Sequence, residues 1–222
     1  MGLDMYLERY PRYKDFGPEK IQNYESWLQW KNDPKAKGHS FKVWCGGNEK
    51  NLPDAKDGAY LATFFKTRYY HWDDDHRYPN ELIHEQVAYW RKANAVHKWF
   101  IDNVQDGVDD CEYHSEVRKD QLAELVSICE EILKNAVLAK GKVQNGWNFK
   151  NGKEVPNYEE GLTVINPEVC EDLLPTQSGF FFGSTGYDQY YMEDIRKTYE
   201  MCKKVLDETD FEKQMLFYRS SW

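Results

Sequence analysis

Residues 80–104 read NELIHEQVAYWRKANAVHKWFIDNV, and this stretch bears on the fold more than any other. Apolar side chains recur in it every three or four residues, the spacing that places side chains on one face of a helix. Asn80 is a favourable N-cap and Gly107 a terminator, so we expect a helix over 80–104. Its apolar stripe consists of Ile83, Val87, Trp90, Asn94, His97, Ile101 and Val104.

The rest of the chain predicts two further main helices, a helix that Pro18 opens and Pro34 ends, and several strands. The apolar periodicity favours helices over about 120–139, with Gly141 as a C-terminal cap, and over about 188–206. Residues 2–10 alternate as a half-buried strand does, and 215–219 read as a final strand. We expect these two terminal strands to lie side by side in one sheet.

Shorter strands are expected at 41–45, 111–117 and 180–182, and Asn151-Gly152 is a strong hairpin signal. Strands and helices do not alternate regularly, which indicates an α+β fold with one mixed or antiparallel sheet packed against three main helices. We expect one domain over 1–222, with a surface insertion at 32–58, where Gly, Lys, Asn and Asp are frequent.

The composition is that of a globular protein and limits its partners. Hydrophobic residues make up 41% of the chain, aromatic residues 16%, and the formal net charge is −9. The negative charge argues against nucleic-acid binding and permits a basic protein partner or a homo-oligomer. No apolar stretch is long enough to span a membrane. Five widely spaced cysteines indicate reduced thiols in a cytoplasm.

Asn94 and His97 are the first candidate site, because a buried amide and imidazole must be hydrogen-bonded. One interpretation is a pocket floor with Asn94 and His97 as ligand contacts, with Trp90 on the same face and Arg91 at the edge. The other is a core network in which both side chains bond to backbone carbonyls. The sequence leaves both open.

The loop GFFFGSTGYD is the second candidate, because it joins an expected strand to the start of the last helix. Free N–H groups at such a place bind anions well. Ser184, Thr185, Tyr187 and Asp188 would then contact a ligand. Ser184, Thr185 and Asp188 equally suit ordinary helix capping.

No sequence motif identifies a catalytic centre, a metal site or a cofactor. Residues His71–His76 gather imidazoles and carboxylates, and Glu81 and His84 form one ExxH pair, whereas a di-iron bundle needs two such pairs. A solvated acidic loop is the preferred interpretation, with no metal required for folding and no cofactor. GxSxG, CxxC, HExxH and the dinucleotide-binding glycine pattern are all missing from the sequence.

Several strings taken together carry a resemblance: MGLDMYL at the start, YWRKANAVHKWF followed by GVDDC, LLPTQSGFFFGSTGYD, and the final SSW. The chain resembles a family of small proteins of bacteriophages and prophages. Residues 32–58 lie outside the match, and Arg219 stands where an uncharged polar residue is expected. The resemblance implies expression in the cytoplasm of an infected bacterium and implies no activity.

The expected function is therefore that of a non-enzymatic phage accessory protein. It would bind and inhibit or redirect a host protein, or a small molecule that signals in the host's defence against phages. The alternative is a small-molecule or nucleotide-binding enzyme, with its pocket around Asn94, His97 and the Ser184-Thr185 loop.

Overall fold

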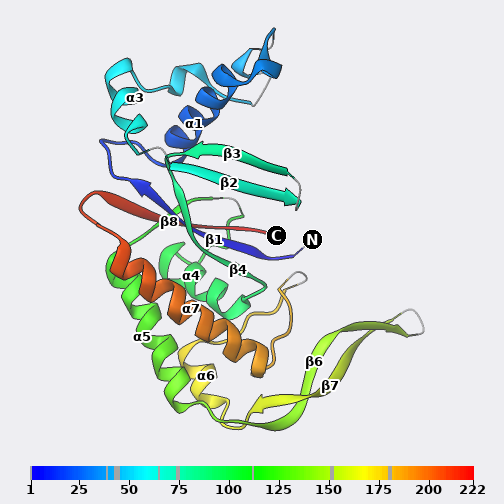
Figure 1. The fold of residues 1–222 in the computed structure, drawn as a ribbon. Coiled ribbons are helices and arrows are strands. Elements are labelled where there is room, and N and C mark those ends of the chain that lie inside the picture. Colours follow the sequence, from blue (N-terminus) through cyan, green and yellow to red (C-terminus); the bar gives the residue numbers. More distant parts are fainter. Residues whose placement is uncertain are drawn as a thin grey trace. The chain divides into compact units, whose positions relative to one another are not determined.

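The computed structural model describes residues 2–38, 40–42, 46–64, 66–73, 76–111, 113–150, 153–179 and 182–222, and Figure 1 shows its fold. The helices are α1 (Pro18–Asn32), α3 (Ala55–Ala62), α4 (Asn94–Val104), α5 (Lys119–Asn135), α6 (Glu168–Leu173) and α7 (Gln189–Glu208), with 3₁₀ turns η1 (Pro34–Ala36) and η2 (Glu49–Asn51). The strands are β1 (Asp4–Pro11), β2 (Lys66–Asp73), β3 (His76–Leu82), β4 (Glu85–Arg91), β5 (Ser115–Val117), β6 (Leu138–Lys150), β7 (Lys153–Val164) and β8 (Gln214–Ser221). The α+β class is confirmed.

A four-stranded antiparallel sheet has the strand order β4-β1-β8-β5, and β2–β3 and β6–β7 form two separate hairpins. The N-terminal and C-terminal strands are neighbours, which confirms the expectation from their apolar patterns. Met5 and Leu7 of β1 and Leu216 and Tyr218 of β8 are fully buried. Their neighbours Glu8, Met215 and Phe217 are buried as well, so both faces of these two strands are largely covered.

The chain divides into two compact units. Unit 1 comprises Met1–Leu7, Val87–Thr209 and Leu216–Trp222, and unit 2 comprises Glu8–Gln86 and Asp210–Met215. The single domain over 1–222 stays a prediction. So does the insertion at 32–58, whose described part contains η1, η2 and the start of α3.

The helix expected over 80–104 is wrong in its first half. Residues Glu85–Arg91 form β4, and α4 begins only at Asn94. In β4 the buried residues Ala88 and Trp90 alternate with exposed Tyr89 and Arg91, so a period of two fits this segment as well as the helical stripe does. Lys92 then turns the chain with φ 58°, outside the right-handed helical region.

The helix expected over 120–139 ends early, at Asn135, and β6 follows from Leu138. The amide of Asn166 ends it: Asn166 Nδ2 donates to the Asn135 carbonyl and Asn166 Oδ1 accepts from the Val137 N–H. Gly141 is therefore in β6 and is not a cap. A Cβ there would lie 2.4 Å from Thr163 Oγ1 on the paired strand, so the hairpin itself requires this glycine.

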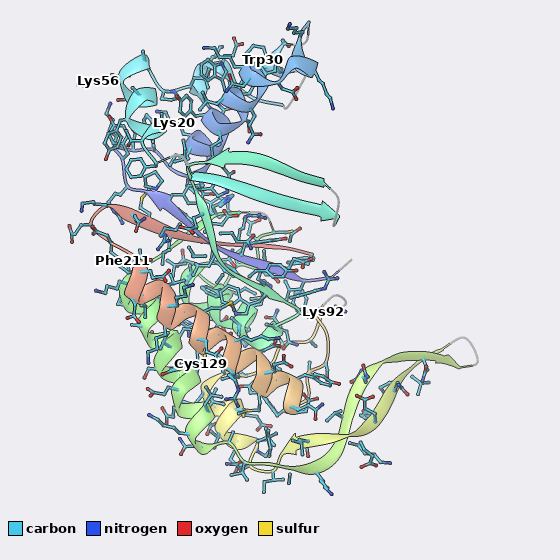
Figure 2. All side chains as sticks on the ribbon, in the orientation of Figure 1. Lys20, Trp30, Lys56, Lys92, Cys129 and Phe211 are labelled. Carbon is cyan, nitrogen blue, oxygen red and sulfur yellow. The ribbon has the colours of Figure 1, made fainter. Side chains whose placement is uncertain are left out.

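The packing of α5 against α7 forms much of the core of unit 1. Fully buried Cys129 of α5 is labelled in Figure 2. The last helix, expected over 188–206, spans Gln189–Glu208. The residues of the two expected apolar stripes that are buried are Leu122, Leu125, Cys129, Ile132, Met192, Ile195, Cys202 and Val205.

The shorter strands expected from the sequence are confirmed only in part. Only Ser115–Val117 of 111–117 forms a strand, β5. Residues 41 and 42 are helical, Phe182 lies in a bend, and 43–45 and 180–181 lie outside the described residues. The β6–β7 hairpin exists as expected, although its Asn151-Gly152 turn also lies outside them.

Candidate functional site

A cavity of about 400 Å³ in unit 1 gathers polar and charged side chains from four segments. The segments are the turn from β4 into α4, the bend of β6, the loop before α7, and the first turns of α7. The volume is in the range of small-molecule sites. The lining residues that bear on its chemistry are Arg91, Lys92, Asn94, Ala95, Val96, Asn145, Ser184, Asp188, Asp194 and Lys197.

The start of α4 supplies unpaired N–H groups to this cavity. Among the described residues no side chain caps α4, and the backbone amides of Ala95 and Val96 donate to none of them. Both residues line the cavity. Because first-turn amides carry the positive end of the helix dipole, this wall favours an anion.

Lys92, labelled in Figure 2, precedes the first turn of α4 and also lines the cavity. Its φ of 58° is left-handed, a conformation that glycine adopts freely and a lysine does not. None of the described acidic side chains forms an ion pair with it. Strained backbone of this kind clusters at binding and catalytic sites, where the surrounding structure holds it in place.

Asn94 is a structural link at the cavity wall. Its Nδ2 donates to the carbonyls of Phe182 at 3.0 Å and Ser184 at 2.8 Å, and its Oδ1 accepts from the Gln177 N–H at 3.1 Å. These three bonds occupy both of its amide protons and one acceptor site. Asn94 therefore attaches the loop before α7 to the start of α4, as the core-network interpretation predicts.

The loop from Gly183 to Asp188 does what ordinary capping requires. Asp188 Oδ1 accepts from the N–H groups of Tyr190 at 2.9 Å and Tyr191 at 3.2 Å, which caps α7. Ser184 Oγ accepts from the Gly186 N–H. The Tyr187 hydroxyl accepts from the Thr176 N–H, and the Thr185 carbonyl accepts from the Thr176 hydroxyl. Of these loop residues, Ser184 and Asp188 line the cavity, whereas Thr185 and Tyr187 do not.

Asp194 is the most perturbed carboxyl group of the cavity. Burial raises its pKa to about 7, while Lys197 opposes the shift. None of the described residues donates a hydrogen bond to its carboxylate. A carboxyl group that titrates near neutral pH can accept or release a proton at the working pH of a cell.

The remaining charges at the cavity are partly neutralised. Arg91 is 3.3 Å from the carboxylate of Asp4, and Lys197 is 2.7 Å from that of Glu193. Both pairs are exposed, so each contributes little to stability. Of the described cations that line the cavity, Lys92 is therefore the one whose charge no described carboxylate neutralises.

Trp90 and His97 lie in the core and do not line the cavity. Trp90 Nε1 donates to Thr198 Oγ1 at 2.9 Å. His97 is fully buried, with Nδ1 2.7 Å from the Tyr218 hydroxyl. Its Nε2 is 3.2 Å from Asp109 Oδ1, near enough for electrostatic attraction but outside hydrogen-bond geometry. Burial lowers the pKa of His97, which favours the neutral ring, while Asp109 opposes the shift.

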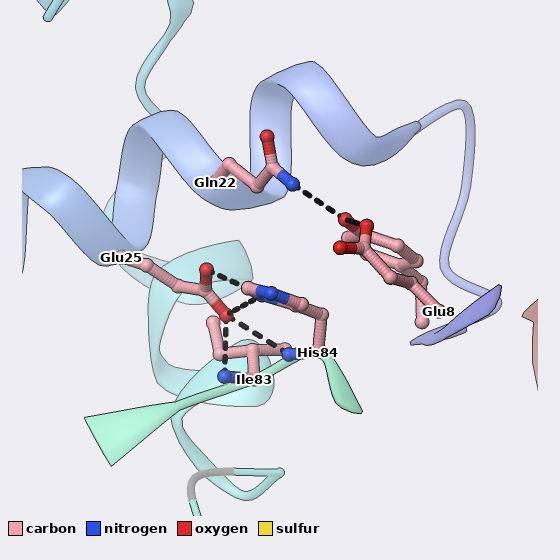
Figure 3. Close-up of polar contacts among 6 residues, drawn as sticks. Glu8, Gln22, Glu25, Ile83 and His84 are labelled. Atoms are coloured by element: carbon pink, nitrogen blue, oxygen red, sulfur yellow. Dashed lines mark hydrogen bonds and ion pairs between the residues drawn. The ribbon is translucent and has the colours of Figure 1, made fainter. Parts of the chain in front are cut away.

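Unit 2 has its own buried polar network, which Figure 3 shows. Glu25, 3% exposed, accepts hydrogen bonds from the backbone N–H groups of Ile83 and His84, and Oε2 lies 2.8 Å from His84 Nδ1. The His84 ring stacks on Tyr10, whose hydroxyl donates to Glu8 at 2.8 Å. The network anchors α1 to the chain before β4. The side chains of residues 71–76 and of Glu81 lie outside the part of the chain that the structure describes.

Sequence reasoning missed Lys92, Asp194 and the bend of β6. Asp194 could have been found, since it falls at intervals of three and four from buried Tyr191 and Thr198 on an otherwise apolar helix face. Asn145 and Gly146 reach the cavity only because β6 has a register shift between Gln144 and Trp147. Gly146, which has φ 77° inside β6, is a local signal for that shift, because an isolated glycine in a strand suggests a bulge.

Comparison with known proteins supplies no further evidence: no family model, curated protein or solved structure matches the chain. Among the described side chains, no group of three or more His, Cys, Asp or Glu could hold a metal ion. A search of the same residues finds no helix both long and apolar enough to cross a membrane.

Proposed function

We propose that this protein binds a small anionic molecule in the cavity between the start of α4 and the first turns of α7. One observation carries the proposal: Ala95 and Val96, whose backbone amides are unpaired, and Lys92, which forms no ion pair with the described residues, line the same cavity of about 400 Å³. Oriented N–H groups with an adjacent cation are what phosphate and carboxylate groups bind in proteins.

Other residues that line the cavity would select the rest of the ligand. Asp194 offers a carboxyl group without a hydrogen-bond partner among the described residues, so a ligand donor such as an amino or hydroxyl group would satisfy it. Asn145 and Tyr190 add neutral polar groups to the lining. A phosphate or carboxylate compound with a polar, hydrogen-bonding body fits this arrangement.

The resemblance to phage proteins supplies the biological setting of the proposal. In an infected bacterium, a protein of this kind would remove a host signalling molecule by binding it. Protein partners of the host remain compatible with the acidic surface.

An enzyme is the second candidate, and the pKa of Asp194 favours it. A carboxyl group with a pKa of about 7 can act as a general acid or base on a molecule held by the α4 amides. Binding without turnover and binding with turnover share the same cavity, so one experiment addresses both.

The test is mass spectrometry of small molecules released by denaturing the purified wild-type protein and the variant Lys92→Gly. Glycine relieves the left-handed backbone and removes the ammonium, so this variant should fold at least as well as the wild type. Lys134→Gln, at an exposed position of α5, is the control that also loses one positive charge.

The proposal expects an anionic compound in the wild type and Lys134→Gln but not in Lys92→Gly. Incubating the wild-type protein with that compound then shows whether the protein only binds the compound or converts it to a product. An equal yield from all three proteins would contradict the proposed site.

A further inference from the structure

The hairpin of β6 and β7 in unit 1 exposes more apolar side chains than its share of the chain. Among the described strands these two pair only with each other, as Figure 1 shows. Of the twelve large apolar side chains exposed in the described part of the chain, six belong to the hairpin and its two flanking residues: Val137, Leu138, Val155, Tyr158, Leu162 and Ile165. Apolar side chains that gather on one exposed element are typical of an interaction surface. A sheet of only two strands also gains stability when something covers one of its faces.

One face of the hairpin is already used within unit 1. Val143 and Glu159 are partners in the register, so their side chains share a face. Val143 is 1% exposed, and Glu159 accepts hydrogen bonds from Asn145 at 2.9 Å and from the Tyr190 hydroxyl of α7 at 3.0 Å. This face is therefore turned towards the start of α7.

The opposite face of the hairpin combines apolar and charged side chains. Side chains alternate along a strand, so the register pairs on either side of Val143–Glu159 lie on this second face. We call it the open face and define it by the pairs Lys140–Leu162, Lys142–Glu160 and Gln144–Tyr158. Tyr158 is 57% exposed. Within the described part of the chain, the three charged side chains of the open face form no ion pair.

The charges on the open face match those on a second copy of the same face. Lys142 and Glu160 lie opposite each other in the ladder. A two-fold axis along the hairpin, between two stacked open faces, places β6 of each copy over β7 of the other at the same level along the strands. Each Lys142 then meets the second copy's Glu160, and the aliphatic part of each Lys140 covers the second copy's Leu162. Stacked sheets lie about 10 Å apart, a distance that such side chains bridge together. The open face thus has the self-complementary pattern that a two-fold interface requires.

Pairing of two copies through their strand edges fits the sequence less well. Two β6 strands side by side would bring Lys140 and Lys142 of both copies close together, and like charges opposite each other are destabilising. Pro156 lacks the N–H group that pairing along β7 would use. Pairing β6 with the second copy's β7 has no two-fold symmetry and would continue into an open fibre. Contact through the open faces is therefore favoured.

We propose that the open face of the β6–β7 hairpin docks a second copy of this chain, face to face and with two-fold symmetry. With 12 residues in β7, the face is about 40 Å long and about 10 Å wide, an area of about 400 Å². Stable interfaces bury about 800 Å² on each partner, so this dimer is weak and its population depends on protein concentration. The proposal does not depend on the anion cavity.

The test is analytical ultracentrifugation of the full chain over a wide range of concentrations. We expect a monomer–dimer equilibrium for the wild type. Lys142→Glu and Glu160→Lys each place like charges across the interface, so each variant alone should associate about tenfold more weakly. Lys204→Glu, the same charge reversal at an exposed position of α7, is the control and should associate as the wild type does.

An equimolar mixture of Lys142→Glu and Glu160→Lys separates recognition between copies from damage to the hairpin. In a mixed dimer the introduced glutamate meets the introduced lysine, and the native Glu160 of one chain meets the native Lys142 of the other. The mixture should therefore associate as the wild type does, although neither variant does so alone. Tyr158→Ser should weaken association as well, because it removes apolar area from the open face.

Three results would overturn the proposal. The first is a wild-type protein that stays monomeric at every concentration at which it is soluble. The second is a mixture of the two charge variants that associates no better than each variant alone, which would mean that Lys142 and Glu160 do not meet between copies. The third is a dimer that neither charge variant weakens, which would place the interface elsewhere on the molecule.

Discussion

Replacing Asp194 by asparagine should stabilise the protein above neutral pH and leave it unchanged at acidic pH. Burial raises the pKa of this carboxyl group from an ordinary 3.8 to about 7 in the folded state. Between these values the folded state holds a proton that the unfolded state has released. Stability therefore falls as pH rises from about 4 to about 7, and the loss is complete above that window.

The size of the effect follows from the shift. One pKa unit corresponds to about 1.4 kcal/mol, so the full shift corresponds to about 4 kcal/mol. Asp194 is only partly buried, and water reaching the cavity reduces the effect to about 2–3 kcal/mol. The asparagine side chain of the variant carries no charge at any pH, so the variant escapes this loss.

The assay is urea denaturation of the wild type and Asp194→Asn at half-unit steps between pH 4 and pH 8.5. The difference between the two proteins reports Asp194 together with its charge coupling to Lys197, Glu193 and Asp188, because groups farther away titrate alike in both. The account expects a difference near zero at pH 4 that grows to about 2–3 kcal/mol at pH 8 in favour of the variant. A difference independent of pH would refute the reasoning about the buried carboxyl group.

Three further outcomes are expected. His97→Ala should lower the free energy of unfolding by about 2–4 kcal/mol, because the Tyr218 hydroxyl loses its partner and a void opens in the core. Chemical denaturation measures this loss. The amount of small molecule recovered from the denatured protein should not change. Deleting residues 215–222 should prevent cooperative folding, since β8 lies between β1 and β5, and a truncated protein that melts like the wild type would contradict the sheet order. Asn166→Ala should lower the melting temperature by a few degrees, since it frees the end of α5 and the Val137 amide, and circular dichroism follows this.

Much of the fold could be predicted from local pattern. The apolar stripes of 120–139 and 188–206 place α5 and α7 within a few residues, because a 3.6-residue period sustained over four turns has few competing explanations. The pairing of the terminal strands could be predicted because both are short, apolar and terminal. The single helix predicted over 80–104 is wrong because Trp90 fits a period of two with Ala88 as well as it fits the helical stripe. Lys92, with its left-handed backbone, separates β4 from α4.

The candidate site could be predicted only in part. Arg91, Asn94, Ser184 and Asp188 do line one cavity, although Asn94 and Asp188 serve mainly as structural links. His97 has the expected helical spacing, and its buried ring contacts the Tyr218 hydroxyl of β8. Lys92 and the bend of β6 reach the cavity through tertiary contacts, which no spacing along the chain encodes.

The most direct test of anion binding at the start of α4 is calorimetric titration with pyrophosphate. The account predicts saturable binding to the wild type and to Lys134→Gln, weakening as salt concentration rises, and at least tenfold weaker binding to Lys92→Gly. Equal binding by wild type and Lys92→Gly, or no binding to the wild type at low salt, would contradict it.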